Sequence, residues 1–498
     1  MGVRTKSVEQ SILDTDEPST RLRKELTWWD LTVFGVSVVV GAGIFTVTAT
    51  TFGNITGPAL SVSFIIAAIT CALAALCYAE FASTLPVAGS AYTFSYATFG
   101  EFVAWIIGWD LILEFAVGAA VVAKGWSSYL GTVFGFSGGT SRVGFIDFDW
   151  GALLIVGLVT TLLAVGTKVS SRFSLVITAI KVSVVLLVIV VGSFYVKAKN
   201  FSPFIPPTET GKGAAGTGID QSVFSLLTGG GGSHYGWYGV LAGASIVFFA
   251  FIGFDVVATT AEETKNPQRD VARGILASLA IVTVLYVAVS IVLSGMVSYT
   301  ELADKGLKNS GGHANLATAF SINGIDWAAK IISIGALAGL TTVVMVLVLG
   351  LSRVMFAMSR DGLLPRGLAM TNQRDAPVRI TVVVGVLIAV AATAFPMSKL
   401  EEMVNVGTLF AFVLVSAGVI ILRRTRPDLK RGFKAPFVPA LPILSIAACG
   451  WLMLNLTVLT WIRFAIWMLL GFVVYALYGY RRSVLGQRLA LQKQADLV

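Results

Sequence analysis

The chain has 498 residues, of which 56% are hydrophobic and only 13% are charged, and its formal net charge is +9. A soluble protein carries about 25% charged residues, so this composition excludes an ordinary soluble domain. Long, nearly uncharged runs predict a polytopic α-helical membrane protein rather than a barrel, whose strands would alternate. The positive charge is then explained by loops that follow the positive-inside rule, and no nucleic-acid partner is expected.

Twelve runs are long enough to cross a bilayer as helices. We predict spans at residues 31–51, 58–84, 101–130, 150–167, 173–195, 241–262, 273–298, 327–359, 379–396, 402–422, 440–460 and 464–480. The termini and the loops on their side carry roughly three times as many Lys and Arg residues as the opposite loops. This bias predicts a multi-pass protein of the cell (plasma) membrane with both termini in the cytoplasm.

The first predicted span contains the run VVVGAGIF, which places Gly41 and Gly43 at mid-depth. Glycine inside a helix costs about 0.5–1 kcal/mol relative to alanine, and a span that only crossed lipid would not need it. We therefore expect the helix to break here. The break would leave free N–H groups near Ala42, Gly43 and Ile44, which suit a carboxylate, and free C=O groups near Val39, which suit an ammonium.

The sixth predicted span repeats this pattern, with Gly253 at mid-depth and Asp255 close by. Free carbonyl groups near Phe249 and Ile252 would again suit an ammonium. Interrupted spans at matching positions of two halves point to the central site of a transporter, and a repeat of five spans must be inverted relative to its partner. Together the breaks match an α-amino acid zwitterion. Close packing by small residues explains each glycine taken singly equally well.

Two segments resemble those of the amino acid–polyamine–organocation (APC) superfamily permeases, and more closely their cationic amino acid transporter branch: GAGIF at 41–45 and FFAFIGFDVVATTAEETKNPQRDVARGI at 248–275. Three more support the resemblance: YAEFASTLPVAGSAYTFSYATFGEFVAWIIGW at 78–109, SRVMFAMSRDGLLPRGLA at 352–369 and RRTRPDLKRGFKAPFVPALPIL at 423–444. It implies a secondary amino acid transporter of all-α integral membrane fold. The implied architecture is the leucine-transporter-type 5+5 inverted repeat with 12 transmembrane helices, the first and sixth unwound. Bacterial members include transporters of neutral amino acids, so the branch does not fix the substrate.

On this resemblance we expect a cytoplasmic N-terminal segment, a ten-helix inverted-repeat transport core, a cytoplasmic loop, two additional transmembrane helices and a cytoplasmic tail. These parts cover residues 1–30, 31–422, 423–439, 440–480 and 481–498. Matching by motif implies a set of residues that contact the substrate: Val39, Ala42, Gly43, Ile44, Phe249, Ala250 and Ile252. Phe249 corresponds to an aromatic residue that covers the ligand in relatives, and a core or lipid-facing phenylalanine is the alternative.

Lys181 lies in the fifth predicted span, about 12 Å from its cytoplasmic edge. Snorkelling cannot bring its amine to water from that depth, so it either pairs with an acid or loses its proton. In relatives, a lysine here takes the place of the cation that sodium-driven transporters bind between the first and eighth spans, and it would donate to the first-span backbone near Gly43. We therefore predict proton coupling through Lys181, without sodium. Its candidate partner or proton relay is Glu114, with Asp110 one turn earlier.

The pocket for the substrate side chain is expected on the eighth span, where Ala338, Gly339 and Thr341 are small and uncharged. No acid there could meet a guanidinium. The sequence therefore favours a small neutral L-amino acid, similar to alanine, over arginine or lysine.

The inner end of the eighth span carries three charged residues, Arg353, Arg360 and Asp361. One interpretation is an anchor that follows the positive-inside rule. The other is an inner gate formed with Glu80 or Glu262, and the sequence favours neither.

The predicted function is import of L-amino acids by proton symport through alternating access. An amino acid exchanger and a uniporter or other transporter of cationic amino acids are the alternatives. A channel is disfavoured because the spans show no continuous polar face. An enzyme is disfavoured because His234 and His313 match no metal spacing and no nucleophile–base cluster is present. No cofactor or metal is expected; the expected partners are an amino acid, protons and the lipid bilayer.

Overall fold

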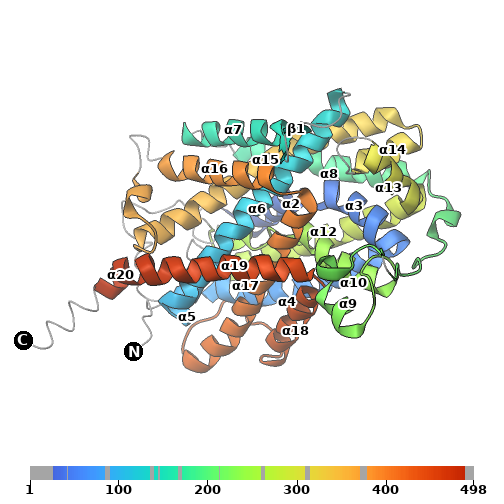
Figure 1. The fold of residues 1–498 in the computed structure, drawn as a ribbon. Helices are drawn as coiled ribbons and strands as arrows, with labels where there is room; N and C mark the ends of the chain where they lie inside the picture. Colours follow the sequence, from blue (N-terminus) through green and yellow to red (C-terminus); the bar gives the residue numbers. More distant parts are fainter. Residues whose placement is uncertain are drawn as a thin grey trace, which may run out of the picture.

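The computed structural model describes residues 26–41, 43–84, 90–134, 140–143, 146–165, 171–211, 213–259, 264–308, 314–370 and 378–487. They form a bundle of packed helices (Figure 1), which confirms the prediction of an all-α fold. A short hairpin is the exception among these residues: β1 (Thr140–Val143) pairs antiparallel with β2 (Ile146–Asp149). The sequence pattern did not predict it.

The helices before the hairpin are α2 (Trp28–Val39), η1 (Gly43–Val47), α3 (Thr48–Thr51), η2 (Phe52–Thr56), η3 (Gly57–Ala59), α4 (Leu60–Thr84), α5 (Ser90–Thr98) and α6 (Glu101–Phe134). Those that follow it up to the sixth predicted span are α7 (Trp150–Ala164), α8 (Ser171–Ser193), η4 (Ala198–Phe201), η5 (Gly218–Asp220), α9 (Val223–Thr228), α10 (Gly236–Val247), η6 (Phe248–Phe251) and α11 (Val256–Thr259).

The remaining helices are α12 (Pro267–Met296), α13 (Tyr299–Lys308), α14 (Leu316–Ile322), α15 (Asp326–Arg360), η8 (Arg366–Ala369), α16 (Val378–Ala394), α17 (Met397–Thr425), α18 (Ala440–Leu454), α19 (Val458–Val474), η9 (Tyr475–Gly479) and α20 (Tyr480–Arg482). The elements labelled η are of two kinds: those that begin at Gly43, Phe52 and Tyr475 are π-helical, and the others are 3-10 helices.

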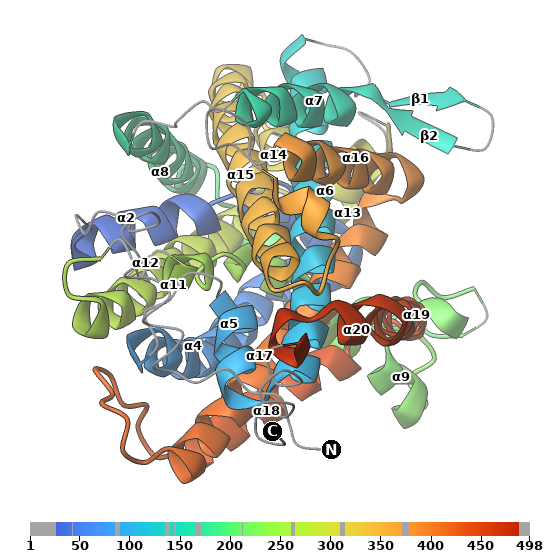
Figure 2. The same cartoon turned by 90° about the vertical axis from the view of Figure 1, so that its left-hand side faces the viewer.

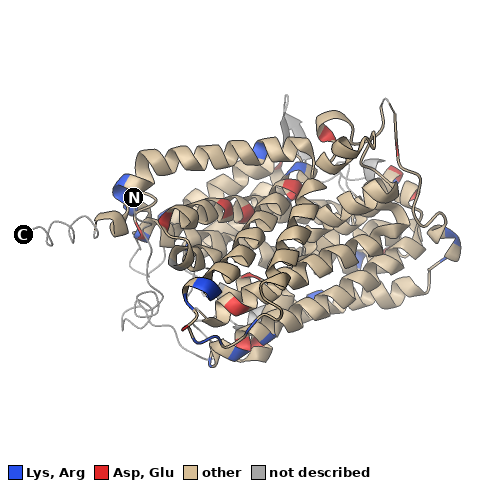
Figure 3. Ribbon diagram, turned by 90° about the horizontal axis from the view of Figure 1, so that it is seen from below, with Lys and Arg blue, Asp and Glu red and all other residues tan. Residues whose placement is uncertain are grey.

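Eight helical segments in the described chain are long and apolar enough to cross a membrane. The first, Trp28–Thr84, covers the first two predicted spans. Three shorter apolar helices, α7, α16 and α18, coincide with the fourth, ninth and eleventh predicted spans. Charged residues are sparse along the middle of the bundle (Figure 3), as a bilayer requires. The structure therefore supports a multi-pass membrane protein, while the count of twelve spans stays a prediction.

Close helix packing holds α2 in place. Helix α2 packs against α12, and a Cβ atom on Gly274 of α12 would lie 2.6 Å from Cβ of Leu31. On α2, a Cβ on Gly35 would lie 2.6 Å from Oγ of Ser278. In lipid, helices gain little from the hydrophobic effect, so small residues that allow close approach carry much of the packing. Helices α6 and α15 pack against each other nearby, and α8 contacts both α2 and α15 (Figure 2).

Candidate functional site

The first predicted span is interrupted where the sequence predicts it. Helix α2 ends at Val39, Val40 is extended with φ −70° and ψ 91°, and helical structure resumes at Gly43. Backbone hydrogen bonds border the break on both sides: Val40 N donates to Val36 O at 2.9 Å, and Phe45 N donates to Gly41 O at 3.3 Å. Ala42, a predicted substrate contact, lies outside the described residues.

The sixth predicted span is interrupted as well. Helix α10 passes into the 3-10 turn η6, Ile252 is extended with φ −62° and ψ 139°, and α11 begins at Val256. Gly253 has φ +114°, a conformation that other residues rarely adopt. A Cβ on Gly253 would also lie 2.7 Å from Cγ1 of Val38, so this glycine permits both the turn and the close approach of α2.

The two interruptions touch each other. A Cβ on Gly43 would lie 2.1 Å from Cα and 2.4 Å from Cβ of Ala250. Gly43 was predicted to leave space for a ligand at its backbone, but the space beside its Cα is filled by Ala250. At Gly43 the structure therefore matches the alternative explanation, close packing by a small residue, and this packing sets the distance between the two interruptions.

Side chains from other helices donate hydrogen bonds to carbonyl oxygens at the end of α2. Tyr286 of α12 donates from its hydroxyl to Val39 O at 2.7 Å. Lys181 of α8 donates from Nζ to Ser37 O at 2.8 Å. These carbonyls are among those that a helix end leaves without a partner. Because Val39 O was predicted to accept from a substrate ammonium, one of its two lone pairs is already used.

Lys181 bridges α2 and α15. Its side chain is fully buried, and a Cβ on Gly339 of α15 would lie 2.9 Å from Cγ of Lys181. The lysine thus lies between the first and eighth predicted spans, as the family resemblance implied. Two details differ from expectation. Its amine bonds Ser37 rather than the backbone near Gly43, and Gly339 lies under the lysine stem instead of beside an open pocket.

The predicted pairing of Glu114 with Lys181 is wrong. Lys181 forms no ion pair with any residue that the structure describes. Glu114 lies instead near Asp110 and Asp255, within hydrogen-bonding reach of Thr408. The helical phase explains the error, because Glu114 and Asp110 lie on one face of α6 and α8 packs elsewhere.

These three carboxyl groups form a buried acidic cluster. Both carboxyl oxygens of Asp110, Oε1 of Glu114 and Oδ1 of Asp255 have no hydrogen-bond partner within the described part of the chain. Ionising three adjacent carboxyl groups without a cation is costly in a low-dielectric interior. The cluster can therefore hold protons.

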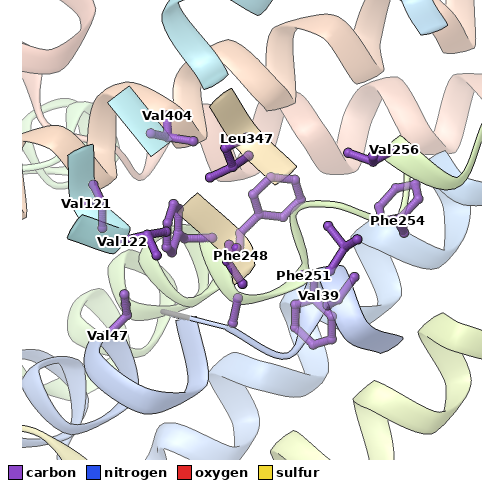
Figure 4. Close-up of a cluster of buried hydrophobic side chains, with 14 of the residues drawn as sticks. Val39, Val47, Val121, Val122, Phe248, Phe251, Phe254, Val256, Leu347 and Val404 are labelled. Carbon is purple, nitrogen blue, oxygen red and sulfur yellow. The ribbon is translucent and has the colours of Figure 1, made fainter. Parts of the chain in front are cut away.

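Apolar side chains surround the interruptions. Figure 4 shows Phe248, Leu347 and Val404 together with Val39 and Val121 around the chain breaks. Leu347 and Val404 were not predicted as site residues. For Leu347 the missed signal is the helical spacing on α15, where the face that carries Gly339 continues one and two turns later. Val404 lies on α17, and no such spacing connects it to a predicted site residue.

The predicted pocket residues are engaged in packing. Thr341 accepts a hydrogen bond from Nε1 of Trp126 at 3.0 Å, and Ala338 is half-buried. Val343, one turn after Gly339, faces the first interruption, since a Cβ on Gly41 would lie 3.0 Å from its Cγ2. Among the other predicted contacts, Ile44, Phe249 and Ala250 are buried and Ile252 is half-buried.

Glu80 forms an ion pair, although with different partners from those considered. Glu80 accepts from Nε of Arg423 at 2.8 Å and from its terminal nitrogen at 2.6 Å. The backbone N–H of Ala435 donates to the same carboxylate at 2.8 Å, and Arg431 lies 3.4 Å away. Glu80 thus fastens the 423–439 loop to α4. Asp361 accepts from the hydroxyl of Tyr92 at 2.7 Å, and Glu262 lies outside the described residues.

The sequence is similar to known transport proteins. A family model described as amino acid permease matches residues 26–481. The chain is 41% identical to the branched-chain amino acid permease BcaP of Bacillus subtilis (strain 168), over 97% of this chain and 99% of that protein. It is 40% identical to the methylthioribose transporter of the same organism, over 95% and 97%. It is 37% identical to cationic amino acid transporter 4, vacuolar, of Arabidopsis thaliana, over 86% and 68%. These relatives are named for three different kinds of cargo.

Proposed function

This chain belongs to the amino acid permease family, and from that premise we propose that it imports L-amino acids by proton symport through alternating access. The relatives are named as permeases and transporters, so the chain is a transporter rather than an enzyme. The observation that carries the proposal is the contact between two interrupted helices, one of which is held at its end by the buried amine of Lys181.

The proposed architecture is a 5+5 inverted repeat over residues 31–422, followed by two further transmembrane helices at 440–480. The interruptions support it, because they fall in the first and sixth predicted spans and meet each other. We further propose that both termini, 1–30 and 481–498, are cytoplasmic and that the protein lies in the cell membrane. The uneven distribution of Lys and Arg supports that orientation.

The proposed substrate site is the backbone at the two interruptions. The N–H groups that begin the second half of the first span, near Ala42, Gly43 and Ile44, would bind the carboxylate. The carbonyl groups of Phe249, Ala250 and Ile252, with the free lone pair of Val39, would bind the ammonium.

The proposed substrate has an uncharged side chain. The valine, leucine and phenylalanine side chains around the interruptions support this choice, since apolar surroundings favour an apolar side chain (Figure 4). We propose small neutral L-amino acids similar to alanine. Branched-chain residues are the first extension to test, because one relative is named for them.

The proposed coupling group is Lys181. When protonated, its amine donates a charge-assisted hydrogen bond to Ser37 O and so fixes the end of α2 beside the break. Loss of the proton weakens this bond and releases that end. Protonation would thus be linked to the conformation of the first interruption. Glu114 would serve as a second proton-holding group, together with Asp110 and Asp255 rather than with the lysine.

Uptake of labelled L-alanine, L-leucine and L-arginine into proteoliposomes tests the proposal, with pH, sodium and voltage gradients imposed one at a time. Proton symport predicts accumulation of a neutral amino acid against its gradient when the outside is acidic, without sodium and without internal amino acid. Transport that requires internal amino acid would indicate an exchanger instead.

A second candidate is transport of cationic amino acids. The buried cluster of Asp110, Glu114 and Asp255 favours it, because the described residues supply this cluster with no cation. Strong preference for L-arginine in the same assay would select this candidate and reject the neutral substrate.

A further inference from the structure

The helices that lead into the two interruptions end in the same way. Helix α2 and helix α10 both have 12 residues, and each ends where an interruption begins. The third residue from the end is a serine in both, Ser37 in α2 and Ser245 in α10. In both helices the carbonyl oxygen of this serine accepts a hydrogen bond of 2.8 Å from a side chain of another helix.

The donor is Lys181 for α2 and Asn405 for α10. Lys181 lies in the fifth predicted span, and Asn405 of α17 lies in the tenth. In the proposed 5+5 inverted repeat, the first span corresponds to the sixth and the fifth span to the tenth. The two hydrogen bonds then occupy equivalent places in the two halves, with Asn405 as the counterpart of Lys181.

Asn405 binds the end of α10 through its amide NH2 group. Nδ2 donates to Ser245 O at 2.8 Å and to Ile246 O at 3.2 Å, and the side chain is fully buried. Backbone carbonyl oxygens only accept hydrogen bonds, so the NH2 group is the part of the amide that faces them. Carbonyl groups at a helix end lack intrahelical donors, and the bilayer core has no water to replace them. The amide therefore supplies partners that this helix end needs.

The other end of the same amide indicates a role in positioning. Oδ1 of Asn405 has no hydrogen-bond partner among the described residues. Burial of an unpaired acceptor is costly, and this cost opposes the gain from two hydrogen bonds between neutral groups. Because the net stabilisation is small, the residue is better explained by the place at which it holds the backbone of α10.

We propose that Asn405 is a positioning residue for the substrate site, which holds the end of α10 so that the carbonyl groups of the second interruption face the substrate ammonium. The inference rests on the proposed function, because it takes an amino acid bound at the two interruptions as the cargo. Ile246 lies two residues before η6, so fixing its carbonyl group also fixes the start of the turn that leads to Phe249 and Ile252. A site that is ordered in advance binds its ligand more tightly.

The two equivalent hydrogen bonds differ in the charge of the donor. Lys181 can lose its proton, whereas the amide of Asn405 has no proton that titrates. The bond at the first interruption therefore responds to protonation, and the bond at the second does not. One half of the transporter would couple to protons, while the other keeps its carbonyl groups in place in every protonation state.

The test is Asn405→Asp, with the KM measured for exchange of labelled L-alanine and L-leucine in proteoliposomes that have the same pH on both sides. A carboxyl group donates a hydrogen bond only while it is protonated, so the variant has one donor at low pH and none at high pH. The ratio of variant to wild-type KM should stay within about twofold near pH 5 and rise to about tenfold near pH 8. Ionisable neighbours such as Glu401 on α17 and Asp110 beside Gly407 are common to both proteins, so the ratio reports the change at position 405.

Asn323→Asp is the matched control. Nδ2 of Asn323 also donates to two carbonyl groups at a helix end, to Met296 O at 3.1 Å and to Ala319 O at 3.0 Å. Asn323 follows α14 and lies outside the predicted spans, so its KM ratio should stay near one at both pH values.

Asn405→Leu tests the same role if Asn405→Asp does not reach the membrane, because leucine has a similar size and no donor at any pH. Its KM should be about tenfold above that of the wild type at both pH values. Its accumulation under an imposed pH gradient should equal that of the wild type, because Lys181 is unchanged.

A KM ratio that does not change with pH for Asn405→Asp, or a wild-type KM for Asn405→Leu, would overturn the positioning role while amino acid transport itself stands. A wild-type protein that neither exchanges nor accumulates these amino acids would overturn the proposed function and this inference together.

Discussion

Replacing Lys181 by methionine should abolish proton coupling without preventing folding. Methionine keeps an unbranched stem against Gly339 but removes the charge and the hydrogen bond to Ser37 O. The lost charge-assisted bond is worth about 1.5–3 kcal/mol. Removal of an ion from a buried position recovers several kcal/mol of desolvation. Since these two terms oppose each other, Lys181→Met should fold, with a thermal midpoint in detergent equal to or above that of the wild type.

The assay is accumulation of labelled L-alanine in proteoliposomes that hold no amino acid and no sodium, with the outside one pH unit more acidic. One pH unit corresponds to about 1.4 kcal/mol and supports up to about tenfold accumulation at one proton per substrate. The wild type should approach that ratio, whereas Lys181→Met should only equilibrate its substrate. Lys330→Met, a change at an exposed lysine of α15, is the control and should accumulate normally. Uphill accumulation by Lys181→Met would refute the coupling role.

Three stability predictions follow from the same geometry, each measured as the thermal midpoint of the purified protein. Gly43→Ala places a methyl group 2.1 Å from Cα of Ala250 and should cost more than about 3 kcal/mol, so a variant as stable as the wild type would mean that the interruptions do not touch. Gly253→Ala puts a side chain at φ +114° and should cost about 1–2 kcal/mol before any clash; an unchanged midpoint would argue against the turn described here. Glu80→Gln removes the charge that Arg423 binds with two nitrogens and should cost about 3 kcal/mol, and a neutral effect would show that the inner ion pair does not hold the 423–439 loop.

The sequence alone was sufficient to predict the features that depend on the depth of a residue in the membrane. Glycines at mid-span predicted both interruptions, and the depth of Lys181 predicted that its amine does not reach water, as its burial confirms. Long apolar runs predicted the large helices. Each of these conclusions follows from a property of one segment, which can be read without knowing its neighbours.

Features that depend on how helices rotate against each other could not be predicted in the same way. Glu114 and Lys181 both lie within predicted spans, and only the packing shows that the glutamate faces Asp255 instead. The contact between Gly43 and Ala250 depends likewise on the approach of two backbones that are far apart in the sequence. The bonds from Arg423 to Glu80 depend on the path of a loop, which carries no periodic signal.

The most direct test of the account is a structure of the protein with bound L-alanine. The account predicts the carboxylate within hydrogen-bonding distance of the N–H groups of Gly43 and Ile44, and the ammonium at the carbonyl oxygens of Phe249 or Ile252. An amino acid held elsewhere by charged side chains, with no ligand between the interruptions of the first and sixth predicted spans, would contradict it.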